Sequence, residues 1–477
     1  MMRMTFGLLL LASSFVASAG TQMSNNESLT FGAFGKVALY RPASAIEDVV
    51  LFVSGDGGWN QGVVDMAKQL VLMNALVLGI DMPRFETALK AEKGACAYPA
   101  AEFEALSQYV QKKLDLPDYK TPILAGYSSG ATLVYALLAQ APGGTFAGGL
   151  SLGFCPDLEV TKPLCKGSGL TFVPLPKKNG FVFDANPALP APFHVLQGDI
   201  DQVCQPEATR TYLSKIPAAK LYWLPKVGHG YSVPKNWLPQ FRDAYRDLRT
   251  VSAPDRTQAH TSLGTTGAST PSVDDLPLVE VPAVGEVQDS VAVILTGDGG
   301  WAGLDKQVAG ALAARGIRCI GWNSLRYYWT ARTPDSAAAD LARIVLLIQA
   351  QSPGAKVLLI GYSLGADVLP FLISRLSETQ RMMIASATFI APSLSVAFEF
   401  HLSNWTGGSQ ADAKPTLPEM QKLAGMKLLC LYGTDDEDSL CPKLPAELAS
   451  VQKMPGGHHF GGDYEAVASR IIAATQP

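Results

Sequence analysis

The sequence predicts an α/β protein made of two similar domains in tandem. The chain has 477 residues, of which 48% are hydrophobic and 17% charged, enough apolar material for more than one core. Short apolar runs alternate with amphipathic stretches, as expected of parallel strands and the helices that cover them. A set of motifs also occurs twice in the same order, roughly 235 residues apart, a spacing far too long for a solenoid repeat.

The repeated motifs divide the chain. Ser-Gly-Asp-Gly-Gly-Trp at 54–59 returns as Thr-Gly-Asp-Gly-Gly-Trp at 296–301, and Gly-Tyr-Ser-Ser-Gly at 126–130 returns as Gly-Tyr-Ser-Leu-Gly at 361–365. Asp-x-x-Cys and Gly-His follow in both halves. We therefore expect homologous domains at 28–250 and 288–477. The Ser-, Thr- and Pro-rich stretch 251–287 has no apolar period and is predicted to be a flexible linker.

In the second half the apolar runs and helical patterns are easily separated. The predicted strands are Ser290–Leu295, Ile317–Gly321, Lys356–Ile360, Ala385–Ile390 and Lys427–Tyr432. The predicted helices are Asp305–Ala314, Ala337–Gln351 and Ala366–Leu376. Each half also has an insertion before a late strand, Asp157–Pro192 in the first and Ser393–Lys422 in the second. We expect these insertions to form a cap or lid over the carboxyl ends of the strands.

The first nineteen residues have the features of a secretory signal peptide. Arg3 precedes a short apolar run, and Ala17-Ser18-Ala19 supplies the small residues of a cleavage site. The run is too short to cross the roughly 30 Å of a bilayer as a helix. We expect cleavage after Ala19 and an exported protein.

Charge and cysteine content narrow the function classes further. Lys and Arg number 38 against 42 Asp and Glu, a net charge of −4, so the basic surface typical of nucleic-acid binding is absent. Seven cysteines in an exported chain permit disulfides and leave at least one thiol over. We expect a Cys155–Cys165 pair, with Cys319 and Cys430 as buried thiols. No CxxC motif supports a zinc ribbon or a thioredoxin-type site.

The Gly-x-Ser-x-Gly motif predicts a nucleophile in each domain. A strand ends just before Gly361 and a helix begins at Ala366, which is the strand–turn–helix setting of a nucleophile elbow at Ser363. The same pattern surrounds Ser128. A tight glycine turn with an incidental serine is the alternative reading of both.

A nucleophilic serine needs a histidine base and an orienting carboxylate, and α/β-hydrolases carry them in the chain order Ser, Asp, His. The first domain offers Asp201 and His229. The sequence therefore predicts two α/β-hydrolase-like domains, each a mainly parallel sheet covered by helices on both faces.

Two assignments in the second domain stay open. Asp438 matches Asp201 through the Cys that follows, whereas Asp436 stands three residues after a strand-terminal glycine, as Asp201 does. The Cys match favours Asp438. His458 is favoured as the base over its neighbour His459 because it aligns with His229.

Acyl transfer also needs N–H donors for the oxyanion. One would be the backbone N–H of Leu364, or Ser129 in the first domain, because it follows the nucleophile. Gly299 and Gly300 in the recurring Gly-Asp-Gly-Gly-Trp loop would supply the other. The alternative is that this loop is a tight turn with a packed Trp.

The second half resembles the AcvB/VirJ family of bacterial virulence proteins. The likeness rests on Thr-Gly-Asp-Gly-Gly-Trp at 296–301, Ser-Leu-Arg-Tyr-Tyr-Trp-Thr-Ala-Arg-Thr-Pro at 324–334, Gly-Tyr-Ser-Leu-Gly-Ala-Asp at 361–367 and Pro-Gly-Gly-His-His-Phe at 455–460. AcvB-like members carry a preceding domain, as this chain does. The resemblance implies an α/β-hydrolase fold, a periplasmic location and hydrolysis of aminoacyl-phosphatidylglycerol to a free amino acid and phosphatidylglycerol. It also places catalysis mainly in the second half.

Several further residues fit that substrate. Arg326 and Arg332 would bind the headgroup phosphate, unless they pair with local carboxylates. Asp435 would receive an ammonium, or belong to a solvated acidic turn, and His459 would bind substrate or pack. A run of aromatic residues would line a lipid-facing mouth or fill the core: Trp322, Tyr327, Tyr328 and Trp329.

No metal or organic cofactor is implied, and the expected partner is a phospholipid headgroup met by peripheral membrane contact. Two other functions remain open at this point. One is a serine esterase or peptidase that acts on a soluble substrate. The other is a non-catalytic periplasmic binding factor for secreted virulence cargo.

Overall fold

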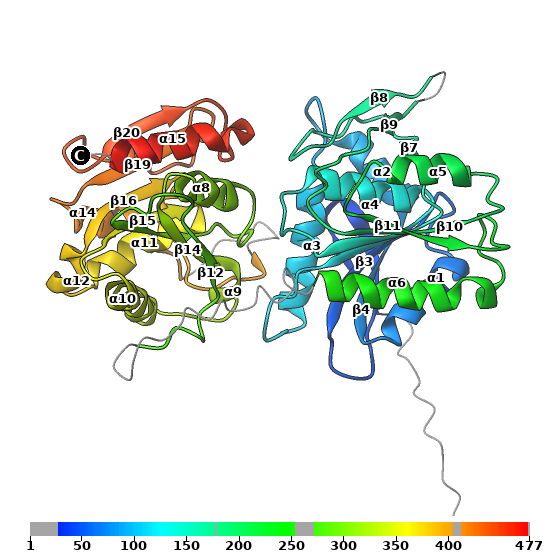
Figure 1. Cartoon of the computed structure of the whole chain (residues 1–477), viewed down its shortest axis with the longest axis horizontal. Coiled ribbons are helices and arrows are strands. Elements are labelled where there is room, and N and C mark those ends of the chain that lie inside the picture. Colours follow the sequence, from blue (N-terminus) through cyan, green and yellow to red (C-terminus); the bar gives the residue numbers. More distant parts are fainter. Residues whose placement is uncertain (1–26, 177–178, 253–270, 404–411, 476–477) are drawn as a thin grey trace, which may run out of the picture.

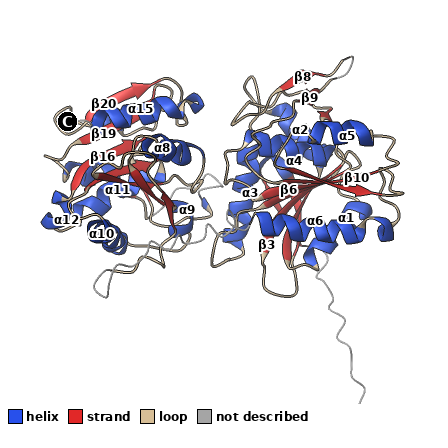
Figure 2. Cartoon of the chain, in the orientation of Figure 1, coloured by secondary structure: helices blue, strands red, loops and turns tan. Residues whose placement is uncertain are grey.

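The computed structural model describes residues 27–176, 179–252, 271–403 and 412–475, which form two α/β domains side by side (Figures 1 and 2). The predicted signal peptide, 1–19, lies outside the described residues. Within the described part, no helix combines the length and the apolar character needed to cross a bilayer.

The first domain is built on an eight-stranded sheet in the order β1-β2-β4-β3-β5-β6-β10-β11. The strands from β4 to β11 run parallel, β2 is antiparallel to its neighbour β4, and β1 is antiparallel to β2. Their bounds are β1 Glu27–Phe31, β2 Gly35–Tyr40, β3 Asp48–Val53, β4 Ala75–Ile80, β5 Ile123–Tyr127, β6 Gly148–Leu152, β10 Phe193–Gly198 and β11 Ala219–Leu224.

Helices cover both faces of this sheet because successive residues of the central strands bury opposite faces. In β3, for example, Val49 and Leu51 pack into one core and Val50 and Phe52 into the other. Helices α1 Gln61–Val71 and α6 Leu238–Val251 close one side. The other side is closed by α2 Met82–Ala91, α3 Pro99–Lys113, α4 Ser129–Gln140 and α5 Pro206–Leu213.

The second domain repeats the plan with a seven-stranded sheet in the order β12-β14-β13-β15-β16-β19-β20. Only β12 runs antiparallel to its neighbour. The strands are β12 Leu278–Val281, β13 Ser290–Leu295, β14 Arg318–Trp322, β15 Lys356–Tyr362, β16 Ile384–Ile390, β19 Leu428–Gly433 and β20 Ser450–Met454. The helices are α8 Gly303–Ala313, α9 Ser324–Tyr327, α10 Pro334–Gln351, α11 Leu364–Ser374, α12 Glu378–Met382, α14 Thr416–Gln421 and α15 Tyr464–Thr475.

The strands and helices predicted for this half are confirmed to within three residues at each end. The predicted linker is too long, however, because β12 lies inside 251–287 and pairs with β14. Residues 253–270 of that stretch lie outside the described residues. This strand is difficult to predict from the sequence because it has only four residues and just one of them, Leu278, is buried.

The two insertions fold into small sheets. The first carries β7 Asp157–Leu158, β8 Phe172–Pro174 and β9 Phe181–Phe183 as an antiparallel sheet. The second carries β17 Ser395–Val396 and β18 Lys414–Pro415, paired antiparallel, before α14. Residues of the second insertion line the cavity at Ser363 described below.

Three disulfides correct the predicted cysteine pairing. Cys165 is bonded to Cys96, and Cys155 to Cys204, so the expected Cys155–Cys165 pair is wrong. Cys430 is bonded to Cys441 and is not a thiol. The prediction failed because the bridges join segments that only the fold brings together. Cys319 is a buried free thiol, as expected.

An aromatic contact joins the two domains. Trp329 donates its Nε1–H to the Leu116 carbonyl at 2.7 Å, and its ring lies 5.3 Å from that of Tyr119. Lys112, on α3, donates to the Trp329 carbonyl and to Glu399, both at 2.8 Å. Figure 1 shows α3 on the side of the first domain that faces the second. The aromatic run is therefore core and interface, because Trp322, Tyr327, Tyr328 and Trp329 are each at most 2% exposed.

The recurring Gly-Asp-Gly-Gly-Trp loop is held by the same contact in both domains. The ring of Trp301 lies flat on β14 at Gly321, where an added Cβ would come within 2.1 Å of it. Trp59 covers Gly79 of β4 in the same way, at 2.2 Å. A side chain at either glycine would displace the Trp and the loop that it anchors.

We predict that Gly321→Val lowers the free energy of unfolding of the second domain by about 1–3 kcal/mol, since an overpacked core must shift backbone or rotamers. Urea titration followed by circular dichroism measures the change. The matched control is Gly310→Ala on α8, where nothing lies within 4 Å of the new Cβ, and which should stabilise by roughly 0.5–1 kcal/mol. Equal midpoints for Gly321→Val and the unmodified protein would contradict this packing.

Candidate active site

Each Gly-x-Ser-x-Gly serine occupies a sharp strand-to-helix turn. Ser363 joins β15 to α11 with φ 50° and ψ −119°, and Ser128 joins β5 to α4 with φ 55° and ψ −125°. Such a left-handed backbone is uncommon for serine and persists only where the surroundings impose it. The flanking glycines are required, because a Cβ on Gly361 would meet the Gly365 carbonyl oxygen at 2.5 Å.

In the second domain the turn delivers Ser363 to a hydrogen-bonded chain. Ser363 Oγ lies 2.9 Å from His458 Nε2, and His458 Nδ1 lies 3.0 Å from Asp436 Oδ2. A hydroxyl, an imidazole and a carboxylate in this order can move a proton away from the serine oxygen. The preference for His458 over His459 agrees with this geometry.

The preference for Asp438 is wrong: the structure brings Asp436 to His458 and leaves Asp438 exposed. The turn after the strand decides the position. The Asp436 N–H donates to the Gly433 carbonyl as the Asp201 N–H does to that of Gly198, so both carboxylates stand three residues beyond the end of their strand. The Cys match misled because Cys204 and Cys441 belong to disulfides that are not equivalent.

The first domain holds an equivalent chain. Ser128 Oγ lies 2.9 Å from His229 Nε2, and His229 Nδ1 lies 2.9 Å from Asp201 Oδ2. Burial alone would raise the pKa of Asp201. Hydrogen bonds from His229 and from the N–H groups of Cys204 and Val203 outweigh it, so the pKa of Asp201 falls below its usual value. The carboxylate is thus held in its charged form beside the imidazole.

Asp201, His229 and Cys204 also lie close enough together to suggest a metal site. Cys204 is bonded to Cys155, however, and a disulfide sulfur is not the thiolate that zinc binds. The two remaining side chains are already hydrogen-bonded to each other. This cluster is therefore poorly suited to a resident metal.

The Gly-Asp-Gly-Gly-Trp loop meets the nucleophile through its first glycine and its aspartate. A Cβ on Gly297 would lie 3.4 Å from that of Ser363, and Asp298 lines the cavity that Ser363 opens into. The predicted oxyanion role of Gly300 is wrong, because its N–H donates to the Gly297 carbonyl within the turn. Gly299 is directed toward Glu104 of the first domain, where an added Cβ would lie 3.6 Å from the Glu104 carboxylate.

The cavity at Ser363 is acidic. It has a volume of about 230 Å³, and its ionisable lining residues all carry carboxyl groups: Asp298, Asp367 and Glu399, the last of which is paired with Lys112. Asp367 follows Ser363 by four residues on α11 and accepts a hydrogen bond from the Ser393 N–H. Burial raises the pKa of Asp367 to about 8. The equivalent residue of the first domain is Thr132, which donates to the Cys155 carbonyl, so the two serines face different surroundings.

Two predicted phosphate ligands lie away from this cavity. Arg332 packs over the Tyr327 ring, 4.5 Å from its centroid, and donates to the Tyr327 carbonyl. Arg326 is half-buried near Tyr119 and Asp118 of the first domain, and burial lowers its pKa. Neither lines the cavity at Ser363.

The other two predicted substrate ligands differ from each other. Asp435 is an exposed turn residue, its N–H bonded to the Gly456 carbonyl, and it does not line the cavity at Ser363. His459 places its Nδ1 2.7 Å from the Tyr362 hydroxyl and lines a second cavity beside the loop. Burial lowers the pKa of His459, and the neighbouring His458 adds to the effect.

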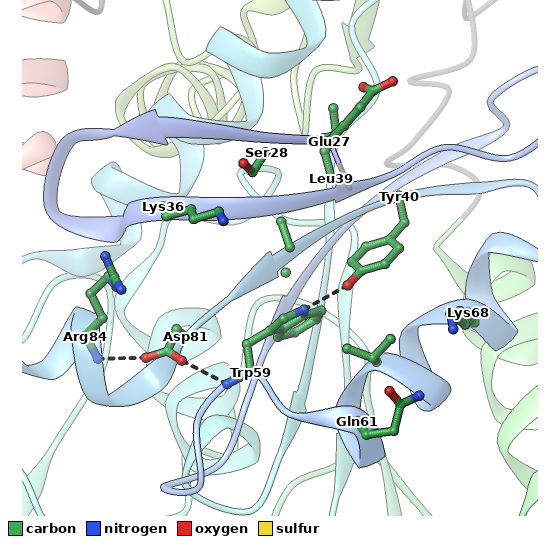
Figure 3. Close-up of a pocket in the computed structure, with 13 residues that line it drawn as sticks. Glu27, Ser28, Lys36, Leu39, Tyr40, Trp59, Gln61, Lys68, Asp81 and Arg84 are labelled. Atoms are coloured by element: carbon green, nitrogen blue, oxygen red, sulfur yellow. Dashed lines mark hydrogen bonds between the residues drawn. The ribbon is translucent and has the colours of Figure 1, made fainter. Parts of the chain in front are cut away.

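A larger cavity, of about 700 Å³, lies in the first domain and is lined in part by Trp59, the tryptophan of the Gly-Asp-Gly-Gly-Trp loop. Figure 3 shows Trp59 donating its Nε1–H to the Tyr40 hydroxyl and its backbone N–H to Asp81. Three basic side chains border this cavity: Lys36, Lys68 and Arg84. Ser128, Asp201 and His229 are not among its lining residues. Sequence reasoning missed this cavity because its walls come from β1, β2, β4 and α1.

Comparison with solved structures finds hydrolases. A serine hydrolase homologue from Coxiella burnetii is 15% identical and covers 48% of this chain and 98% of its own, with a TM-score of 0.33. A serine hydrolase without a lid from Xanthomonas campestris is 17% identical over 48% of this chain and 95% of its own, also at 0.33. Est1E from Butyrivibrio proteoclasticus is 13% identical over 48% and 99%, at 0.31. No curated protein sequence matches the chain.

Each domain has the α/β-hydrolase architecture, since a parallel sheet presents the nucleophile elbow at a strand end and the His and Asp follow in later loops. The family model of the bacterial virulence protein VirJ matches residues 47–145 and 289–477, more than half of the chain and parts of both domains. The chain therefore belongs to the VirJ family.

Proposed function

We propose that the chain is a periplasmic serine esterase that hydrolyses the aminoacyl ester of aminoacyl-phosphatidylglycerol, with lysyl or alanyl as the acyl group. The observation that carries the proposal is the chain from Ser363 through His458 to Asp436, next to a cavity whose charged residues are acidic. An ester carbonyl is a suitable target for Ser363, and a protonated amine on the acyl group would be attracted to the carboxylates of the cavity.

The reaction proceeds in two stages at Ser363. His458 Nε2 takes the hydroxyl proton as Oγ attacks the aminoacyl carbonyl, and Asp436 stabilises the resulting imidazolium. The tetrahedral intermediate collapses, and the proton passes from His458 to the departing glycerol oxygen of phosphatidylglycerol. Water, deprotonated by His458, then attacks the aminoacyl-enzyme and releases the free amino acid, which restores the Ser363 hydroxyl.

The oxyanion would be held by the N–H groups of Leu364 and Asp298. Leu364 is the first residue of α11, so its N–H has no partner within the helix. Asp298 belongs to the loop that contacts Ser363, and its N–H has no hydrogen-bond partner among the described residues. Two such donors supply the largest electrostatic contribution in many acyl transfers.

The substrate and location rest on the family resemblance together with these features. Three disulfides suit an exported protein in an oxidising compartment, as do the predicted signal residues 1–19. The phospholipid headgroup would be met by peripheral contact with the membrane.

A second catalytic centre at Ser128 is also proposed. Its support is the chain from Ser128 through His229 to Asp201, in which both distances are 2.9 Å, against 2.9 and 3.0 Å in the second domain. Because Thr132 replaces Asp367 there, we expect the two centres to differ in the acyl groups that they accept.

We predict that Ser363→Ala abolishes amino-acid release from lysyl- and alanyl-phosphatidylglycerol in mixed micelles, with a loss of about 10⁴-fold or more because the nucleophile is gone. Ser128→Ala is the matched control and should leave this release unchanged. Mass spectrometry of the released amino acid measures both.

Three outcomes would contradict the proposal in different ways. Release that survives Ser363→Ala and ends with Ser128→Ala would move the lipid activity to the first domain. Equal turnover of short-chain soluble esters and the lipid would favour an esterase for soluble substrates. No turnover of any ester would favour a binding factor that keeps the hydrolase fold as a scaffold.

We also predict that Asp436→Asn lowers kcat for the same lipids by about 10³-fold or more, since His458 loses the carboxylate that orients it. Asp438→Asn, two residues away and exposed, should change kcat by less than about twofold. The opposite ranking in single-turnover kinetics would contradict the assignment of Asp436.

A further inference from the structure

A cavity of about 300 Å³ lies between the two domains, beside the second-domain active site. Helix α3 of the first domain forms one wall, and the Gly-Asp-Gly-Gly-Trp loop, the start of α8 and the start of α15 form the other. Figure 1 shows α3 facing the second domain. The volume is at the lower end of the range for small-ligand sites, roughly 300–1,000 Å³.

The lining of this cavity is acidic and aromatic. It includes the carboxyl groups of Glu104, Asp298 and Asp305 and the rings of Tyr362 and Tyr464, and no Lys or Arg is among its residues. Lys306, next to Asp305 in sequence, directs its Nζ toward Gly144 of the first domain instead. His459, the remaining titratable group, has its pKa lowered by burial and contributes no positive charge at neutral pH.

Asp305 is the strongest sign that a ligand belongs here. Its side chain is only 2% exposed, and within the described residues its Oδ1 atom has no hydrogen-bond partner. Leaving a buried polar atom without a partner is destabilising, so native proteins seldom do so. Glu104 also lines the cavity without a hydrogen bond or ion pair to any described residue.

The cavity is next to the reacting serine. Asp298 lines both this cavity and the one at Ser363, and Tyr362, which immediately precedes Ser363, forms part of its wall. The two cavities therefore share the side chain of Asp298, and the second adjoins the turn that carries Ser363.

We infer that this interdomain cavity binds the protonated amine of the aminoacyl group, and that Glu104 of the first domain completes the specificity site of the second. The inference rests on the proposed function and names the part of the enzyme that selects the acyl group. A primary ammonium offers three donors, which match Glu104, Asp305 and Asp298, and aromatic rings favour a cation beside them. The first domain would thus be a part of the second domain's site.

The electrostatics agree with this assignment. Burial raises the pKa of Glu104 to about 8, and the Asp298 carboxylate adds to the effect. Burial also raises the pKa of Asp305 well above its usual value. Without a ligand, the raised pKa values favour the protonated forms of Glu104 and Asp305, so the cavity carries less negative charge. A bound cation lowers these pKa values and so favours the ionised carboxylates.

Calorimetry in the catalytically silent Ser363→Ala chain tests the site without requiring turnover. The probes are L-lysinamide and L-alaninamide, which are cationic, and N-acetyl-L-alaninamide, which is not. We expect the cationic amides to bind and Glu104→Gln to weaken their binding by about tenfold or more, because an ion-paired partner is lost. Binding at pH 7 should also release protons, detected as a dependence of the heat on the buffer, and Glu104→Gln should reduce this release.

The matched control is Glu102→Gln on the same helix, whose carboxylate would lie 3.5 Å from a Cβ added to Gly32 of the first domain. It should leave binding unchanged, and Glu104→Asp, which keeps the charge, should bind more tightly than Glu104→Gln. Failure of both cationic amides to bind, equal binding of the acetylated amide, or equal losses from Glu102→Gln and Glu104→Gln would each overturn the inference.

Hydrolysis separates this inference from the proposed function. The ratio of kcat/KM for alanyl-phosphatidylglycerol to that for its N-acetylated form should fall about tenfold in Glu104→Gln, with the rate for the acetylated lipid unchanged. If the unmodified protein hydrolyses neither lipid but binds the cationic amides through Glu104, the proposed function fails and the cation site stands. If hydrolysis is normal and the ratio does not move, the site fails and the proposed function stands.

Discussion

The backbone at Ser363 is the constraint on which the rest of the site depends. A serine with φ near 50° is held at the end of β15 because its flanking glycines let α11 approach β13 and β15 more closely than any side chain would allow. A Cβ on Gly365 would lie 2.1 Å from the Leu295 carbonyl oxygen. The same approach brings Gly297 to the serine and so fixes the distance between Ser363 and the Gly-Asp-Gly-Gly-Trp loop. The strained backbone at Ser363 therefore determines where its hydroxyl lies relative to His458 and the loop at Gly297.

Two copies of this scaffold have diverged in the residues around the turn. The residue four positions after the serine is Thr132 in one copy and Asp367 in the other. Thr132 donates to the Cys155 carbonyl, just before the first insertion, and Asp367 accepts from the Ser393 N–H, at the start of the second. The disulfides differ as well: Cys204 ties the loop after Asp201 to Cys155, whereas Cys441 bonds to Cys430 on β19 of its own sheet. The chemistry of the serine, histidine and carboxylate has been kept while their surroundings changed.

Much of this arrangement could be predicted from the sequence, for a physical reason. The fold, the elbow serines and the Gly-bound histidines follow from local patterns: a buried strand, a glycine turn and a helix that are contiguous in the chain. A local signal also indicates Asp436, its spacing from Gly433, but the Cys that follows Asp438 indicates the wrong residue. The oxyanion role predicted for Gly300 is wrong because a glycine-rich loop does not reveal which N–H its own turn uses.

What could not be predicted depends on segments that are distant in sequence. The pairing of Cys96 with Cys165 and the contact of Trp329 with Leu116 join parts of the chain that periodicity cannot relate. The same holds for Glu104, which reads as an ordinary carboxylate on an amphipathic helix. Its position opposite Gly299 exists only once the two domains meet.

The contact made by Lys112, Trp329 and Glu399 has a consequence for how the two domains stay together. It is heterologous, because α3 and the segment after it in one domain meet the loops of the other, so it uses different surfaces of two similar folds. Since both surfaces belong to one polypeptide, each meets the other at an effective concentration of roughly millimolar, and the contact does not need the area of a stable dimer. Covalent linkage thus lets the two domains form the walls of a cavity together without the interface area that two separate proteins would need.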